Sequence, residues 1–159
     1  MAKLSANVQL LLRVYDESFD KVGWYGPNLR SSFKGLNATQ AAWRPHPARH
    51  NVWENVVHCA YWKYVVRRRI LKLKKGSFAL EGSNWFKRPE ELSESAWRSD
   101  IELLEAEHEE LRSVIVSLND KKLEVTSTKP NAPIRLIYGI AQHDVYHAGQ
   151  IRLVRRNMA

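Results

Sequence analysis

Residues 93–118 read SESAWRSDIELLEAEHEELRSVIVSL, and one stripe of positions recurs through this stretch at alternating spacings of four and three residues. The positions of this stripe are Trp97, Ile101, Leu104, His108, Leu111, Ile115 and Leu118. Such spacing predicts one face of an α-helix, with Ser93 or Ser95 capping its start. The mean period of about 3.5 residues favours shallow crossing angles between helices, so the segment predicts a helical bundle.

Three further segments carry apolar residues at helical spacing, and together with the first they predict four long helices. These segments are residues 5–22, 51–75 and 133–154. Gly23 and Gly76 follow the first two as stop signals, and Pro133 suits the first turn of the last. The intervening stretches predict connections, with one turn of helix near residues 38–42. We therefore predict an all-α four-helix bundle, formed by a single domain over residues 1–159.

The composition indicates a folded protein without a membrane span. Hydrophobic residues make up 44% and charged residues 26% of the 159 positions, which excludes the composition of a disordered chain. No apolar run approaches the roughly 18 residues that a membrane-spanning helix needs. The first 20 residues carry charges where a signal peptide is apolar, so we expect a cytoplasmic protein.

The charge and the single cysteine narrow the classes of ligand. Because Cys59 is the only cysteine, a metal site must rest on histidines and carboxylates. The formal net charge is +8, and basic residues gather near the ends of the second and fourth predicted helices. Cations at these ends complement the helix dipole, and no recognised DNA-binding motif accompanies them. Binding to nucleic acid is therefore disfavoured.

Three histidines form the candidate metal site. His143 and His147, in the stretch QHDVYHAGQ, lie four residues apart, so both rings project from one face of the last helix. His58 lies beside the apolar stripe of the second helix, and a third imidazole from a facing helix would complete a three-histidine site with open coordination positions. Three imidazoles suit zinc, nickel, copper or iron. The alternative is that each ring is an ordinary core histidine with a hydrogen-bonded partner.

Other polar residues are candidates for supporting roles. Gln150 returns to the face of His143 and is placed to orient a ligand or water. His108 is a further candidate to face the substrate, although a core histidine is the favoured interpretation. Asp144 points away from the histidine stripe and is at best a partner of a ligand. His46 and His50 are expected to face solvent.

Two motifs resemble the DinB and YfiT-like family of small bacterial four-helix proteins. The stretch GLNATQAAWRPHPARHNVWENVVHCAYW, residues 35–62, contains Leu36 and a Trp-Arg-Pro sequence ahead of the helix with His58. The stretch QHDVYHAGQIRLVRR, residues 142–156, contains His143 followed by His147, Gly149 and Gln150, which is similar to the family's motif in the last helix. The order and separation of the two motifs carry the resemblance.

The resemblance implies a divalent metal, most often zinc or nickel, held by three histidines in an up-up-down-down bundle that is frequently a homodimer. Aromatic residues such as Trp24, Trp85 and Trp97, which one small core does not readily cover, agree with a dimer. Family members of known chemistry include transferases that use low-molecular-weight thiols. We therefore predict a metal-dependent transferase of small molecules, of the thiol type, or a hydrolase. A catalytically silent metal site and an interaction module remain alternatives, and the motifs name no catalytic residue.

Overall fold

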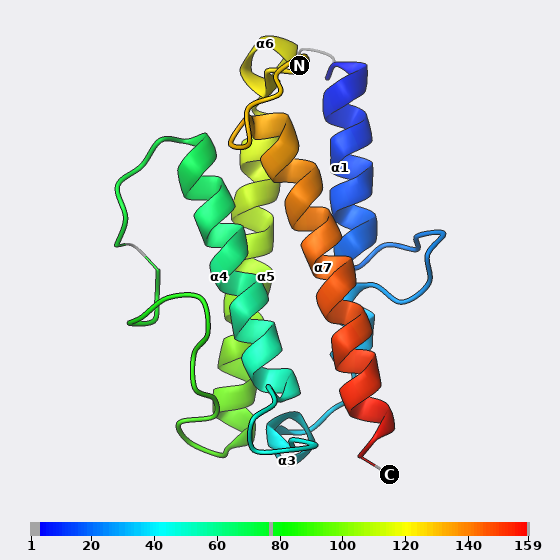
Figure 1. Ribbon diagram of the computed structural model, residues 1–159, viewed down its shortest axis with the longest axis vertical. Coiled ribbons are helices and arrows are strands. Elements are labelled where there is room, and N and C mark those ends of the chain that lie inside the picture. Colours follow the sequence, from blue (N-terminus) through cyan, green and yellow to red (C-terminus); the bar gives the residue numbers. More distant parts are fainter. Residues whose placement is uncertain (1–3, 77, 159) are drawn as a thin grey trace.

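The computed structural model describes residues 4–76 and 78–158, and four long helices dominate it (Figure 1). The long helices are α1 (Ala6–Phe19), α4 (Val52–Ile70), α5 (Glu94–Val116) and α7 (Pro133–Arg156). The short helices are α2 (Leu29–Phe33), α3 (Ala38–Ala42) and α6 (Asp120–Leu123). No β-strand occurs in these two ranges, where a single bridge joins Gly23 and Gly26. The predicted all-α four-helix bundle is confirmed.

The long helices begin where the sequence places their caps. The Asn51 side chain accepts a hydrogen bond from the amide of Glu54, whose carboxylate accepts one from the amide of Asn51, which is a complete capping box. Ser5 caps α1, Ser93 caps α5, and Pro133 occupies the first turn of α7. The capping box of Asn51 and Glu54 fixes the start of α4 at Val52, so His58 lies in its second turn.

Two helices end earlier than the sequence predicts. The second predicted helix runs to Lys75, but α4 ends at Ile70, and Lys72 has a positive φ of 55°. The first runs to Val22 in the prediction, whereas α1 ends at Phe19. The apolar residues beyond both ends, Val22, Leu71 and Leu73, are exposed. A helix in a protein is stabilised mainly by packing of its apolar face, and these residues have no face to pack against.

Side-chain contacts fix the directions of the helices. In the contacts between α4 and α5, the residue numbers of both helices increase together, so the two helices are parallel. In the contacts between α4 and α7, and in those between α1 and α5, the numbers of one helix increase as those of the other decrease, so these pairs are antiparallel. The contacts are Trp53 with Asp100, Arg67 with Glu107, Asn55 with His147, Lys63 with Asp144, Tyr15 with His108 and Ser5 with Asp120. The helices follow the order down-up-up-down, so the expected up-up-down-down order is wrong.

The connections explain this order. An up-up-down-down bundle needs two long crossover connections, each returning along the length of the bundle. In Figure 1 the connection between α4 and α5, described over residues 71–76 and 78–93, makes such a return, running beside α4 to the start of α5. The connection that contains α2 and α3 instead continues downward from the end of α1 past the lower part of α7, and the chain reverses only at the bottom, where α4 begins. As a result, α4 lies between α5 and α7, and its two faces meet different partners.

One of the three tryptophans that were expected to lie outside the core, Trp97, is buried in it. Trp97 is only 3% exposed, packs against Trp53 in the core, and donates its indole N–H to the carbonyl oxygen of Leu36. Trp24, by contrast, is fully exposed, and Trp85 is half-buried. Within the described part of the chain, no helix combines the length and the apolar character needed to cross a membrane.

Candidate metal centre

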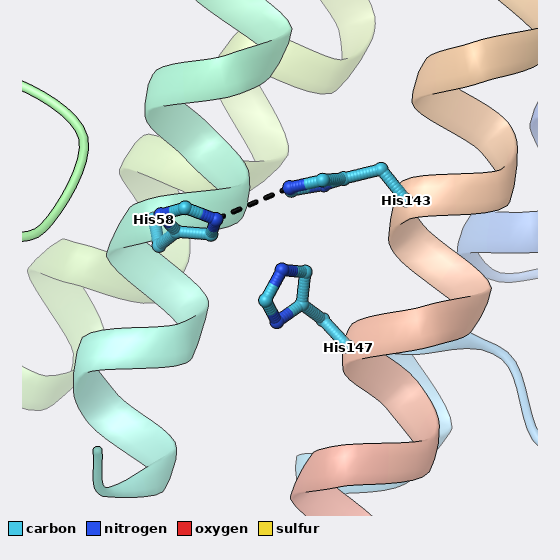
Figure 2. Close-up of side chains that lie close together, drawn as sticks. All are labelled: His58, His143 and His147. Carbon is cyan, nitrogen blue, oxygen red and sulfur yellow. Dashed lines mark hydrogen bonds between the residues drawn. The ribbon is translucent and has the colours of Figure 1, made fainter. Parts of the chain in front are cut away.

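His58, His143 and His147 meet between α4 and α7 (Figure 2). Each offers a ring nitrogen, and these three atoms lie within 4.8 Å of one another. The Nε2 atoms of His58 and His143 are 3.1 Å apart. Because α4 and α7 run in opposite directions, the single histidine of α4 lies opposite the two that α7 presents one turn apart. The predicted convergence of the three rings is therefore present.

Backbone and side-chain acceptors hold two of the rings by their other nitrogen. His58 Nδ1–H donates to the carbonyl oxygen of Asn84 at 2.8 Å. His147 Nδ1–H donates to Asn55 Oδ1 at 2.9 Å, and the amide nitrogen of Asn55 donates in turn to the carbonyl oxygen of Asn51 at 2.7 Å, which fixes the direction of the amide. In the neutral rings of His58 and His147, the lone pair is then on Nε2, the atom free for a metal.

His143 differs from the other two in having a buried Nδ1 without a hydrogen-bond partner. A buried polar atom of this kind costs about 1 to 3 kcal/mol unless something compensates for it. Its Nε2 points at the Nε2 of His58, as the dashed line in Figure 2 shows. With the lone pair of His58 on Nε2, the Nε2–H of His143 is the donor of this hydrogen bond, and a cation between the two nitrogens would take the place of that proton.

The electrostatics of the site favour neutral imidazoles. Burial is the main cause that lowers the pKa of His143 to about 3 and the pKa of His147 to about 4, and the neighbouring imidazoles act in the same direction. Burial also lowers the pKa of His58, against the opposing effect of its hydrogen bond to Asn84. All three rings are therefore uncharged at neutral pH, which is the state that binds metal.

The residues fit a divalent transition metal. Two nitrogens that are each about 2.0 to 2.1 Å from a tetrahedral zinc lie roughly 3.3 Å apart, close to the separation of the His58 and His143 nitrogens. The donor set is three neutral nitrogens, which zinc and nickel accept and which magnesium and calcium do not prefer. Three protein ligands leave at least one coordination position for another molecule.

A pocket of about 640 Å³ lies beside two residues that contact the histidines, although none of the three histidines is among its lining residues. Trp85 lines it and stacks on His58 with ring centroids 3.9 Å apart, and on its other face it stacks on His50 at 3.6 Å. Asn55, the partner of His147, also lines it. The remaining lining residues are Pro45, His46, Ala48, Arg49, Gln150, Leu153, Val154 and Asn157. The pocket is large enough for a small molecule, and it meets the histidine group through Asn55 and Trp85.

The supporting candidates separate into those near the pocket and those away from it. Gln150 lines the pocket and donates to the hydroxyl of Tyr146 at 3.0 Å, so its position agrees with the predicted role. Asp144 is fully buried in an ion pair with Lys63 and does not line the pocket. Its predicted place off the histidine stripe is correct, but a role facing substrate is not supported.

His108 lies apart from the three-histidine group. Its ring stacks between Tyr15 and Phe19, with centroid distances of 4.4 and 3.8 Å, and it is 2% exposed. The favoured interpretation of His108 as a core histidine agrees with this position. His46 and His50 are both exposed as predicted, and the ring of His50 also stacks on Trp85 and bonds to the carboxylate of Glu54.

Sequence reasoning missed three residues that shape the site: Asn55, Asn84 and Trp85. Asn55 precedes His58 by three residues and so shares its helix face, a spacing that the sequence does display. Asn84 and Trp85 lie in the crossover between α4 and α5, where no periodicity relates them to a helix face. Only the return of this crossover alongside α4 brings them against His58.

Comparison with known proteins agrees with the motifs. A sequence model described as the DinB superfamily matches residues 26–151, a range that includes all three histidines. No curated protein and no solved structure matches the chain.

Proposed function

This chain belongs to the DinB superfamily, and from its histidine group we propose that it is a metal-dependent enzyme acting on small molecules. His58, His143 and His147 hold one divalent ion, zinc or nickel, and the reaction is transfer of a low-molecular-weight thiol. Hydrolysis is the second candidate reaction. The observation that carries the proposal is a group of three neutral imidazoles whose ring nitrogens lie within 4.8 Å of one another.

The chemistry of the group follows from its charge. A divalent ion on three uncharged ligands keeps its full positive charge and supplies Lewis acidity to a thiol or water that reaches it. Three residues of the protein orient the metal-ligating rings or shield them from water. Asn84 and Asn55 hold the rings of His58 and His147 in one orientation. Trp85 covers one face of His58 and excludes water from that side.

His50 is a candidate to receive a proton from a ligand of the pocket, on the opposite face of Trp85 from His58. Its Nδ1–H donates to Glu54, whose carboxylate is 6% exposed and also accepts two hydrogen bonds from Arg44. This arrangement leaves Nε2 of a neutral His50 ring as an acceptor in the wall of the pocket. The imidazole side chain is partly exposed, so a proton taken from a thiol or water passes on to solvent.

The test begins with the metal content of protein purified without a metal-affinity tag. We expect close to one equivalent of zinc or nickel per chain by elemental analysis. His58→Ala, His143→Ala and His147→Ala should each lose most of it, while His46→Ala, which changes an exposed histidine outside the group, should keep it. Metal content that is equal in all four variants would contradict the site.

The second stage is a panel of low-molecular-weight thiols with alkylating and epoxide electrophiles, assayed on the metal-loaded protein. Turnover that is lost in His58→Ala supports the thiol transferase. Hydrolysis of ester or amide probes without thiol transfer supports the second candidate. Stoichiometric metal with neither activity would favour a catalytically silent site.

The partner that we propose is a second copy of the chain. Trp24 is fully exposed and follows Val22, which is 95% exposed, while Leu153 on α7 is 65% exposed. Large apolar side chains left in water at this level are typical of surfaces that associate. Sedimentation velocity should give a dimer that Trp24→Ser weakens, and a monomer at high concentration would contradict it.

A further inference from the structure

A second pocket lies on another face of α7, away from the histidine group. Its volume is about 510 Å³, and it is formed between α7 and the segment that joins α1 to α2. Its lining residues are Tyr25, Pro27, Val145, Ala148, Gly149, Arg152, Leu153 and Arg156. Arg152 follows His147 by five residues, which places it about 140° around the helix. This pocket is therefore separate from the metal centre.

Two arginines of this pocket have no partner in the protein. Arg152 is partly buried, Arg156 is exposed, and the two lie one turn apart on α7. In the part of the chain that the structure describes, neither makes an ion pair or a side-chain hydrogen bond. Arg155, between them in sequence, differs because it donates to the carbonyl oxygens of Ser32 and Lys34. Arg155 thus serves the fold, whereas the other two are free to bind a ligand.

The charge of the pocket is one-sided. No aspartate or glutamate lines it, so two guanidinium charges are left without compensation. The helix dipole does not account for both, because its effect is confined to the last turn and Arg152 lies before that turn of α7. Two cations one turn apart are instead suited to a single anion of high charge.

The rest of the lining leaves room for an apolar group. Gly149 is open to the pocket, since a Cβ added there would meet no atom within 4 Å. The ring of Tyr25 packs against Gly23, where an added Cβ would come within 2.9 Å of it. Burial, followed by the charge of Glu17, raises the pKa of Tyr25 to about 12. The phenol is therefore neutral at pH 7 and does not repel an anion.

We propose that this pocket binds a phosphate monoester of a small apolar molecule, with the phosphate held by Arg152 and Arg156 and the apolar part against Val145 and Ala148. A phosphate monoester carries nearly two negative charges at neutral pH and three terminal oxygens, which match two guanidinium forks. A carboxylate or a sulfate ester would neutralise only one of them. The volume of the pocket is that of a site for a small molecule. The inference goes beyond the proposed metal chemistry and does not depend on it.

The experiment compares phenyl phosphate with two probes that each lack one feature. Phenyl sulfate has the same ring and three terminal oxygens but a single charge, and inorganic phosphate lacks the ring. Calorimetry on the zinc-free protein measures binding, so that phosphate does not bind to zinc. We expect phenyl phosphate to bind about three- to tenfold more tightly than either probe. His58→Ala should bind it with unchanged affinity, because the two sites are separate.

Variants locate the effect. Arg152→Gln and Arg156→Gln should each reduce the preference for phenyl phosphate over phenyl sulfate to less than about twofold. Arg69→Gln removes the same charge from an exposed position in the last turn of α4 and should keep the full preference. Gly149→Leu retains both arginines but fills the pocket, so it should lower the affinity for phenyl phosphate to that for inorganic phosphate.

One control concerns the proposed dimer. Leu153 lines this pocket and also belongs to the surface that we assign to the dimer. All variants are therefore compared at a protein concentration where sedimentation velocity gives the same oligomeric state. Circular dichroism confirms that each variant retains its helix content.

The outcomes separate the ligand class from its source. Equal binding of phenyl phosphate and phenyl sulfate overturns the phosphate monoester, and a preference that survives in both arginine variants overturns the site. Two larger sources of the same group are tested: vesicles of equal parts phosphatidylcholine and phosphatidic acid, and a 5′-phosphorylated oligonucleotide. If either binds through the two arginines while phenyl phosphate does not, the small-molecule ligand is wrong.

Discussion

Two buried polar groups lie side by side between α4 and α7, and they differ in what completes them. In one, Lys63 and Asp144 are both fully buried and complete each other as an ion pair, with the ammonium also 4.7 Å from the ring centroid of Tyr15. In the other, three imidazoles of like character face one another, and Asn55 and Trp85 connect them to a pocket. The two charges of the first group neutralise each other, so we call it the closed group, whereas the second, the open group, has no partner of opposite charge until a cation binds.

The largest expected effect lies in the closed group. Lys63→Ala leaves Asp144 as a buried carboxylate without its cation, which should lower the free energy of unfolding by about 3 to 5 kcal/mol. Chemical denaturation of the zinc-free protein measures it. The double variant Lys63→Met with Asp144→Leu removes both charges and should recover most of this loss. A double variant as unstable as Lys63→Ala would show that the loss of stability does not come from the unpaired charge of Asp144.

The next effect lies in the open group. Zinc at about 1,000 times its dissociation constant should raise the free energy of unfolding by about 4 kcal/mol. His58→Ala should abolish most of this increase while changing the stability of the zinc-free protein far less. The double variant of Lys63 and Asp144 should keep the increase, since neither residue belongs to the three-histidine group. Thermal unfolding with and without zinc tests both statements, and equal stabilisation of His58→Ala and the parent protein would refute them.

Asn55→Ala should produce an intermediate effect. Its amide oxygen holds Nδ1–H of His147, so its loss frees the ring to rotate and to change its tautomer. Removal of such a partner typically weakens metal affinity by about 10- to 100-fold. Competition with a chromophoric zinc chelator gives the affinity. Asn55→Asp, which keeps the acceptor, should restore most of it, and an unchanged affinity in Asn55→Ala would mean that the hydrogen bond does not orient the ligand.

The sequence could predict the open group better than the closed one. Histidine spacing on two helices identifies His58, His143 and His147 because the residue type itself suggests metal binding. Lys63 carries no such signal, since a lysine near other cations on α4 resembles a solvated charge. Its burial depends on the packing of α4 against α1 and α7, which bring Tyr15 and Asp144 to the ammonium, and periodicity does not show this packing. The crossover between α4 and α5 brings Asn84 and Trp85 to the site, so these residues were also beyond prediction.

The smallest expected effect is on the pH dependence of stability, and it concerns His108, which lies outside the three-histidine group. Burial lowers the pKa of His108 to about 2, helped by the charge of Lys63, whereas an unfolded histidine titrates near about 6.5. Below pH 6.5 the unfolded chain therefore takes up a proton that the folded ring does not, and stability falls as the pH falls. Between pH 7 and 5.5 this linkage should cost about 1 kcal/mol from His108 alone.

His108→Phe keeps the stack with Tyr15 and Phe19 and should remove this contribution of His108 to the pH dependence of stability. Because His108 lies outside the three-histidine group, the difference between the two proteins should be the same with and without zinc. Denaturation curves at several pH values measure it, and a difference that disappears on zinc binding would place His108 with the open group.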